Sequence, residues 1–361
     1  MKKMWFVVLA AVAALMLTAA VDSEALTSKE LLGRLLYFDD NLSNPAGQSC
    51  ASCHLPKAGW ADPDKSLPVS EGVVPGLFGG RNAPTAAYAA FSPDFYLDPV
   101  EGLWVGGQFW DGRAKDLVEQ AKGPFLNPVE MNNTKDGVVN AVRASHYAWL
   151  FRQVYGRNAL KDVATAYDFI ADAIAAFEKT DQLNRFTSKF DYYVKGKVKF
   201  SAQEKMGLNL FNDPAKGNCA ACHPSTSADG VTPALFTDFT YDNLGIPHNA
   251  EIDALVGAPV PVDLGLGVTV GDSAENGKFK VSTLRNVART APYGHNGYFK
   301  TLKEIVHFYN TRDVAAWPPA EYPDTVNNTE LGNLGLTPAE EDAIVAFLMT
   351  LTDGYFCMTC R

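Results

Sequence analysis

Two five-residue runs in this sequence have a spacing suited to covalent haem binding. Each run contains two cysteines separated by two residues and followed directly by a histidine. Two thiols at this spacing can add to the two vinyl groups of one porphyrin, and the histidine then supplies an axial nitrogen ligand to the iron. The six residues are Cys50, Cys53, His54, Cys219, Cys222 and His223. The sequence therefore predicts two covalently bound c-type haems.

Other uses of these cysteines are less consistent with the sequence. A structural zinc site would need further Cys or His at fixed spacings, and no second C-x-x-C pair lies near either run. The two remaining cysteines, Cys357 and Cys360, are followed by Arg361 where a haem-binding run has histidine. A third haem is therefore not expected. A disulfide and two unpaired thiols both stay open for this pair.

The N-terminus has the features of a secretory signal peptide. Two lysines precede an apolar stretch, residues 6–17, and small residues follow up to Ala20. This order is typical of export signals, and the apolar stretch is short for a membrane span. We expect residues 1–20 to be removed; cleavage near Ala25 and retention as an anchor stay open. Because covalent haem attachment is normally completed outside the cytoplasm, the expected location is the periplasm.

The composition is acidic and argues against two classes of partner. The formal net charge is −10, and removal of the two lysines of the signal peptide makes it −12. An acidic surface repels nucleic acids and anionic membranes. No other stretch is apolar enough to span a membrane, so the mature chain should have no stable membrane span.

The sequence before the two haem-binding runs is repeated. The runs lie 169 residues apart, and each follows a helix that begins with a capping box, at Thr27 or Ser201, and that carries the same Gly and aromatic spacing. A repeat of this length indicates a duplicated domain. We predict a mainly α fold of two tandem c-type cytochrome domains, residues 21–190 and 191–361, whose haems face the domain interface.

Periodicity places further helices and loops in this fold. Apolar residues recur at helical spacing over residues 163–177 and 302–309. Thr337 opens another capping box, with proline at the first helical position. Segments 63–84 and 257–278 are rich in Gly and Pro, so we expect them to be long loops.

Several further stretches resemble one family closely, the bacterial dihaem cytochrome c peroxidases together with MauG. The resemblance covers nearly all of the chain after the signal peptide. It implies a haem-dependent oxidoreductase that uses hydrogen peroxide as electron acceptor. The most specific stretches are residues 107–113, 120–124, 127–131, 236–239, 284–287 and 292–297.

The resemblance implies roles for four residues near the first haem. Trp110 resembles a tryptophan that bridges the two porphyrins and carries electrons between them. Glu130 resembles the carboxylate above the peroxide-binding iron, which moves a proton from the inner to the outer oxygen. Gln120 and Pro124 match the other positions of this distal pocket. From residue type alone, Trp110 could be a core side chain and Glu130 a solvated one.

The resemblance also implies a Ca²⁺ site between the domains. Asn82, Thr290 and Pro292 match the residues that supply it. One side-chain amide oxygen and two backbone carbonyls, completed by water, suit a hard cation.

The chain departs from the usual peroxidase pattern at the first haem. Typical members have a histidine on the loop after the first run, and it blocks the iron until the second haem is reduced. Here no histidine occurs between His54 and His146, and the loop offers Ser66 and Ser70, which are poor iron ligands. We therefore expect the first haem to be five-coordinate and open to peroxide without prior reduction.

A second departure concerns the other haem. Where ordinary members have a methionine ligand, the aligned residue is Tyr309, the residue type that MauG uses. A tyrosinate is a hard anion that favours oxidised iron, whereas methionine raises the haem potential. Tyr309 as a core aromatic and His307 as the ligand are the alternatives, although His307 would face away from Tyr309 on a helix.

Three functions follow from these residues. The first is a MauG-like enzyme that uses peroxide to form a high-valent dihaem state and oxidises a side chain, such as Trp or Tyr, of a periplasmic partner protein. MauG carries a surface tryptophan two residues before the second run, but here that position is Gly217. This difference puts in doubt that the chain acts on the protein substrate of MauG. The second function is a peroxidase that takes electrons from a small cytochrome or cupredoxin. The third is a non-catalytic dihaem electron carrier.

Overall fold

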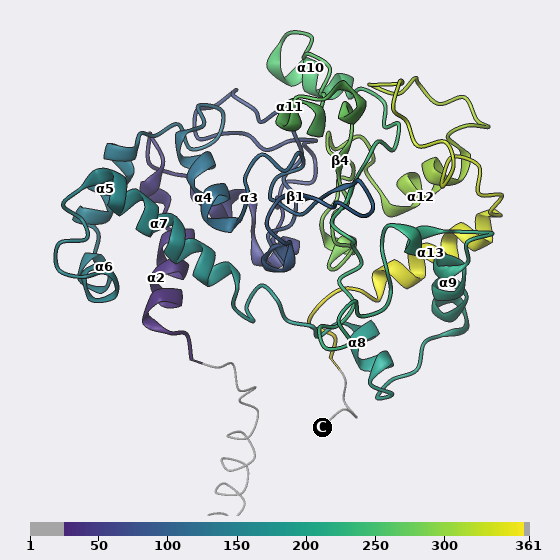
Figure 1. Ribbon diagram of the computed structural model, residues 1–361, viewed down its shortest axis with the longest axis horizontal. Coiled ribbons are helices and arrows are strands. Elements are labelled where there is room, and N and C mark those ends of the chain that lie inside the picture. The colour runs from purple at the N-terminus through teal and green to yellow at the C-terminus, as the bar shows by residue number, and fades with distance from the viewer. Residues whose placement is uncertain (1–24, 357–361) are drawn as a thin grey trace, which may run out of the picture.

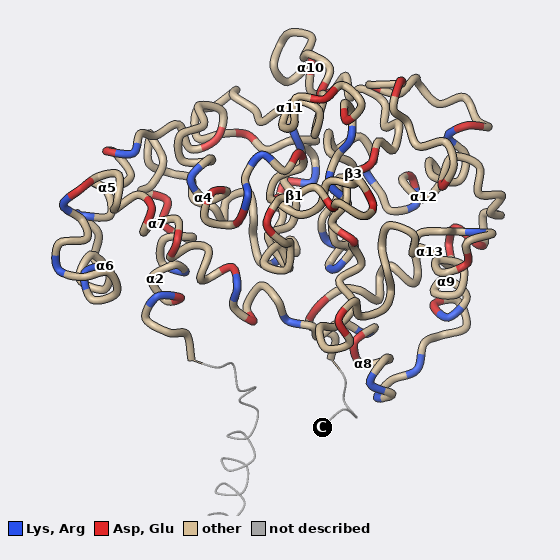
Figure 2. The backbone as a smooth tube through the Cα atoms, in the orientation of Figure 1, with Lys and Arg blue, Asp and Glu red and all other residues tan. Residues whose placement is uncertain are grey.

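The computed structural model describes residues 25–356 of the chain. The predicted signal peptide and the tail cysteines, Cys357 and Cys360, lie outside the described residues. Within them, no helix is long and apolar enough to cross a membrane. Figure 2 shows acidic and basic residues interspersed along the described chain.

The described chain is mainly helical, as predicted, and its strands form only two short antiparallel pairs (Figure 1). The helices are α2 (Ser28–Tyr37), α3 (Cys50–Cys53), α4 (Leu117–Leu126), α5 (Lys135–Ala144), α6 (Ala148–Tyr155), α7 (Val163–Glu178), α8 (Lys189–Val194), α9 (Ala202–Asn212), α10 (Ala250–Val256), α11 (Leu266–Val270), α12 (Leu302–Thr311) and α13 (Pro338–Met349). The strands are β1 (Tyr96–Leu97), β2 (Trp104–Val105), β3 (Tyr241–Asp242) and β4 (Phe279–Lys280), paired β1 with β2 and β3 with β4.

Local capping determines where the main helices begin. The predicted capping boxes at Thr27, Ser201 and Thr337 are all present, with each hydroxyl accepting from the amide of the glutamate three residues later. The predicted helices over 163–177 and 302–309 are confirmed as α7 and α12. The loop prediction for 257–278 is partly wrong, because this segment contains the short helix α11.

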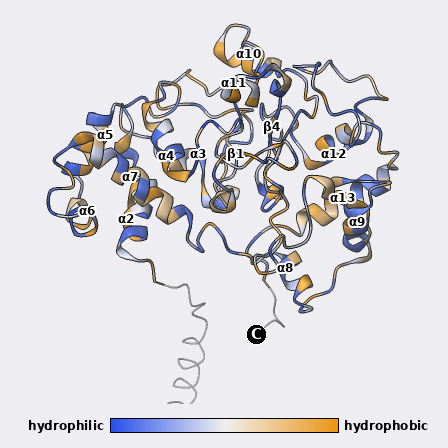
Figure 3. Ribbon diagram, viewed as in Figure 1, coloured by the Kyte–Doolittle hydropathy of each residue, from blue (hydrophilic) through white to orange (hydrophobic). Residues whose placement is uncertain are grey.

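The apolar residues form two separate clusters. The first joins α2, α4, α5, α6 and α7 on one side of the molecule in Figure 1, and the second joins α9, α12 and α13 on the other side. Apolar and polar residues alternate along the helical ribbons in Figure 3, as expected for helices with one buried face. The buried residues of the first cluster end at Leu183 and those of the second begin at Phe190, although the partly buried Leu235 packs against the first cluster. The domain boundary at residue 190 stays a prediction.

The same close helix crossing occurs once in each cluster. A Cβ atom added to Gly33 on α2 would lie 1.8 Å from the carbonyl oxygen of Ala173 on α7. A Cβ atom added to Gly207 on α9 would lie 1.9 Å from the carbonyl oxygen of Ala343 on α13. The repeated glycine of the sequence is therefore explained by a repeated backbone contact, which places the helix before each haem-binding run against a second helix.

Gly207→Ala is expected to destabilise the protein. The added methyl group meets a backbone carbonyl that cannot rotate away, so the helices must separate, at a cost of about 1–3 kcal/mol or more. Urea unfolding of the haem-loaded protein measures this cost. Asn209→Ala, at an exposed position of the same helix, is the control and should change the free energy of unfolding by no more than about 0.5 kcal/mol. Equal stability of the two variants would contradict the crossing.

A buried polar cluster joins the two halves. Arg285 is fully buried and forms an ion pair of 3.0 Å with Asp191, and its guanidinium lies over the rings of Tyr88 and Phe186. The hydroxyl of Tyr88 donates to Asp353 over 2.8 Å. The cluster connects the segment after the first haem-binding run to the C-terminal end of the described chain, and so fixes one half against the other.

Candidate functional site

Two large cavities contain the two haem-binding runs. The first is lined by Cys50, Cys53 and His54 and holds about 1650 Å³ free of protein atoms, part of it open to solvent. The second is lined by Cys219, Cys222 and His223 and holds about 1560 Å³, also partly open to solvent. Two cavities, each with the same three functional groups on its wall, fit two copies of one large apolar ligand.

The two histidines are held in the form that ligates a metal. Nδ1 of His54 lies 3.3 Å from the carbonyl oxygen of Trp60, and Nδ1 of His223 lies 2.8 Å from that of Phe236. A carbonyl partner fixes the proton on Nδ1 and leaves the Nε2 lone pair for a metal. Burial lowers the pKa of both imidazoles, so both stay neutral. This arrangement fits a haem iron in each cavity.

The cysteines also fit a covalently bound porphyrin. All four are unpaired and partly exposed to the cavities. Burial raises the pKa of the Cys53, Cys219 and Cys222 thiols to about 12, so they are neutral. A buried neutral thiol is a poor nucleophile towards small solutes but retains an S–H that can add across a vinyl group.

The first cavity is lined by polar as well as apolar side chains. Gln120 and Pro124 on α4, together with Glu130, line this cavity. Oε1 of Glu130 accepts a hydrogen bond of 2.7 Å from the Asn127 amide. Burial raises the pKa of Glu130, and the Asn127 hydrogen bond opposes this effect only in part. A carboxyl group with a raised pKa in a cavity is suited to accept and return a proton.

Tyr309 lies on the wall of the second cavity, together with His223. Burial raises the pKa of its phenol, with smaller contributions from Cys219, Cys222 and Asp242. His307 has a different position, because it is outside this lining and its Nδ1 lies 2.8 Å from Glu341. Of the two residues considered as second ligands, only Tyr309 therefore borders the cavity.

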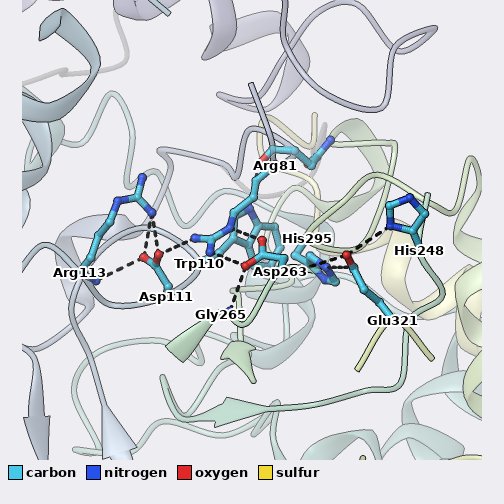
Figure 4. Close-up of polar contacts among 10 residues, drawn as sticks. Arg81, Trp110, Asp111, Arg113, His248, Asp263, Gly265, His295 and Glu321 are labelled. Carbon is cyan, nitrogen blue, oxygen red and sulfur yellow. Dashed lines mark hydrogen bonds and ion pairs between the residues drawn. The ribbon is translucent and has the colours of Figure 1, made fainter. Parts of the chain in front are cut away.

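Trp110 borders both cavities. Its side chain is on the lining of each, and its indole N–H donates to the carbonyl oxygen of Asn82 over 2.8 Å. Figure 4 shows it beside a chain of ion pairs in which Arg81 contacts Asp111 and Asp263, each over 2.6 Å. An indole shared by two cavities can carry an electron from one ligand to the other.

Comparisons with known proteins agree with this site. The sequence model of a family described as di-haem cytochrome c peroxidase matches residues 27–199. The methylamine utilization protein MauG of Paracoccus denitrificans is 39% identical over 343 residues, which cover 89% of this chain and 88% of that protein. This chain belongs to the dihaem cytochrome c peroxidase and MauG family. It is thus a haem oxidoreductase that acts on peroxide and binds two haems.

Two further members show how widely the likeness extends. Cytochrome c551 peroxidase of Pseudomonas aeruginosa is 34% identical, over 89% of this chain and 79% of the peroxidase. The diheme peroxidase BthA of Burkholderia thailandensis has a similar structure, with a TM-score of 0.83 at 33% identity, and the match covers 92% of this chain and 87% of BthA. The relatives thus include a protein named for methylamine utilization and proteins named as peroxidases.

No histidine other than His54 lines the first cavity among the described residues. Ser70 also lines it and hydrogen-bonds to Asp62, whereas Ser66 is exposed and donates to Asp64 over 2.6 Å. His146 is exposed and lies in a shallow depression beside Tyr147. No described residue on this wall is thus a second nitrogen ligand.

The three residues predicted to hold Ca²⁺ line the same cavity. Asn82, Thr290 and Pro292 all line the second cavity, and Asn82 is buried. The Asn82 amide donates to the carbonyl oxygen of Pro68 over 3.1 Å, which directs its carbonyl oxygen elsewhere. The calcium site stays a prediction.

The sequence analysis missed two buried polar residues at the first cavity. Oε2 of Glu178 and Oε1 of Gln48 have no hydrogen-bond partner among the described residues, and both residues line this cavity. Burial raises the pKa of Glu178 to about 8. At neutral pH Glu178 is therefore protonated and can donate a hydrogen bond to an acidic group on the edge of a ligand, such as a porphyrin propionate. Glu178 had a sequence signal, since it follows Ile174 by four residues on an apolar helix face.

Proposed function

We propose that this chain uses hydrogen peroxide to oxidise a side chain of a partner protein. The observation that carries the proposal is Tyr309, which borders the second cavity together with His223. A tyrosinate ligand favours oxidised iron, and an enzyme that holds oxidising equivalents for a slow protein substrate needs this property. A peroxidase supplied by a fast small donor instead benefits from a soft ligand that raises the potential.

The chain's residues would divide the work as follows. A haem held in the first cavity by Cys50, Cys53 and His54 would supply an iron that can bind peroxide and give it electrons. Glu130, as a carboxylate, takes the proton from the inner peroxide oxygen and returns it to the outer one, which leaves as water. Trp110 passes electrons between the two cavities. Asn127 holds Glu130 in one orientation through its hydrogen bond of 2.7 Å.

A plain cytochrome c peroxidase is the second candidate. It is favoured by the peroxidases among the relatives and by Gly217, which is buried and has no room for a side chain. The small donor would then be a cytochrome or a cupredoxin. A non-catalytic carrier is disfavoured, because a carrier needs both irons closed by two ligands, whereas the first cavity offers one histidine and a carboxyl group. We also propose a periplasmic location, which rests on the signal peptide and on the haem-binding runs.

Incubation with peroxide and candidate partner proteins tests the proposed function. Mass spectrometry should then find an oxidised or cross-linked aromatic residue in the partner, at a yield that depends on peroxide. A matched incubation with a small reduced cytochrome measures the second candidate. Fast cytochrome oxidation without any modified partner residue would favour the plain peroxidase.

The resting ferric protein should contain one high-spin and one low-spin haem without prior reduction. The first cavity has one histidine ligand among its described lining residues, whereas the second has His223 and Tyr309. Electron paramagnetic resonance of the oxidised protein distinguishes the two spin states. Two low-spin signals would show that a further residue closes the first iron.

A further inference from the structure

The hairpin of β1 and β2 presents an unusual surface for an acidic protein. Its pairing is Tyr96 with Val105 and Leu97 with Trp104. Four apolar side chains on it are exposed, by 44%, 47%, 87% and 44% of their surface, for Tyr96, Leu97, Val100 and Leu103 in that order. Exposed apolar side chains that gather on one short element are a feature of interaction sites.

The hairpin is held firmly against the segment that contains Trp110. The ring of Trp104 stacks on Phe95, with centroids 4.8 Å apart and planes 7° apart. Phe95 in turn covers this segment, since a Cβ atom on Gly112 would lie 2.6 Å from its ring. The hydroxyl of Tyr241 donates to the carbonyl oxygen of Gly106 over 2.6 Å and ties the hairpin to β3. The partly exposed Trp104 is thus connected to the Trp110 segment by packed aromatic rings.

Among these rings, Trp104 is suited to be oxidised. An indole loses an electron more readily than a phenyl ring. Phe95 is therefore not expected to be oxidised itself and only fills the space between Trp104 and the Trp110 segment. Oxidation of Tyr241 would require its proton to leave, but its partner is a carbonyl that cannot take the proton. Burial also raises the pKa of Tyr241. Trp104 is partly exposed, so water can reach it.

The charge around the hairpin specifies the kind of partner. Residues 94–105 contain three acidic residues, Asp94, Asp98 and Glu101, and no Lys or Arg. Asp94 is paired with Lys115 over 2.9 Å, whereas Asp98 accepts from the amide of Val100 and closes the turn. An apolar centre with an acidic rim is complementary to an apolar patch framed by Lys or Arg.

We propose that the β1–β2 hairpin docks a partner protein whose apolar contact patch is framed by basic residues, and that electrons from this partner enter through Trp104. Trp104 is called the surface station below, meaning the partly exposed residue that is oxidised first by the enzyme and reduced by the partner. The inference rests on the proposed function for the nature of that partner. Reduction of one H₂O₂ to two H₂O takes two electrons and two protons. Each electron passes from the partner to Trp104 and on to Trp110, and the oxidised partner side chain releases the protons to water.

The proposed route also accounts for Gly217. A Cβ atom at Gly217 would lie 2.4 Å from the carbonyl oxygen of Leu210, so no tryptophan fits there without a backbone shift. A surface residue that passes electrons must therefore lie elsewhere, and Trp104 is joined through Phe95 to the segment that contains Trp110.

Trp104→Phe tests the station while it keeps a ring on Phe95. With the haem-loaded enzyme and peroxide, the probes are a reduced lysine-rich small cytochrome c and hydroquinone. The ratio of the cytochrome rate to the hydroquinone rate should fall about tenfold or more. Trp149→Phe, at a tryptophan 62% exposed on α6, is the control and should leave the ratio unchanged. Glu101→Lys should raise KM for the cytochrome and weaken its salt dependence.

A second measurement does not depend on turnover. After peroxide is added without a donor, mass spectrometry should find oxygen added to Trp104 in the parent enzyme and not in Trp110→Phe. An unchanged ratio in Trp104→Phe together with an unmodified Trp104 would overturn the proposal. So would a dimer in solution that shields the hairpin.

The outcomes separate this inference from the proposed function. If Trp104 is oxygenated and the ratio falls, but no partner side chain is ever modified, the inference about Trp104 and the hairpin is supported. The proposed oxidation of a partner side chain is then contradicted. If a partner is modified equally fast by the parent and by Trp104→Phe, the proposed oxidation of a partner side chain is supported. The inference that electrons enter through Trp104 is then contradicted.

Discussion

Glu130→Gln should slow the reaction with peroxide by about 10² or more, because the amide keeps the shape of the side chain but cannot carry the proton. Stopped-flow absorbance of the haem-loaded enzyme mixed with peroxide measures the rate. Haem content and resting spin states should not change, since glutamine keeps the shape of the side chain and can keep the hydrogen bond to Asn127. An unaltered rate would remove Glu130 from the mechanism.

The same residue predicts a pH dependence. Burial raises the pKa of Glu130, and the carboxylate is the form that accepts a proton from peroxide. The parent rate should therefore fall as the pH drops through this raised pKa, at a higher pH than for an ordinary glutamate. In Glu130→Gln this fall of the rate at low pH, the acid limb of the pH profile, should disappear. Glu119→Gln, an exposed glutamate on α4, is the control and should keep both the rate and the limb.

Tyr309→Met should abolish oxidation of the partner protein. If Tyr309 ligates the second iron as proposed, a soft neutral donor replaces a hard anion. The reduction potential of the second haem should then rise by on the order of 0.1 V or more, because axial ligands set haem potentials over a range of about 0.8 V. Spectroelectrochemistry measures the potential, and mass spectrometry measures the partner. Reduction of peroxide by a small donor should continue in this variant.

Two further variants show whether the Tyr309 effect is specific. Tyr309→Phe should leave the second iron without this ligand and shift its spin state. Tyr293→Phe is the matched control, since Tyr293 also lines the second cavity but donates its hydroxyl to the carbonyl oxygen of Val287 over 2.9 Å. It should keep the parent spectrum and potential. If both Tyr309 variants also kept them, Tyr309 would be a packing residue only.

The sequence alone determined the features that depend on neighbouring residues. A C-x-x-C-H run carries its two thiols and its histidine within five residues, so Cys50 and Cys219 could be interpreted without a fold. Capping boxes at Thr27 and Ser201 act over three residues, and the helices begin where the sequence predicts. The roles predicted for Glu130 and Trp110 came from resemblance to a family, since spacing alone left Glu130 as a solvated side chain.

The tertiary structure decided the features that depend on distant segments. The repeated glycine was visible in the sequence, but the carbonyl that excludes a side chain at Gly207 belongs to Ala343, far along the chain. Tyr309 and His307 lie two positions apart on α12, and only the packing around them shows which one borders the cavity. Trp110 became a shared wall residue only once both cavities were in place. Such contacts arise because folding brings together side chains whose separation in the sequence carries no local signal.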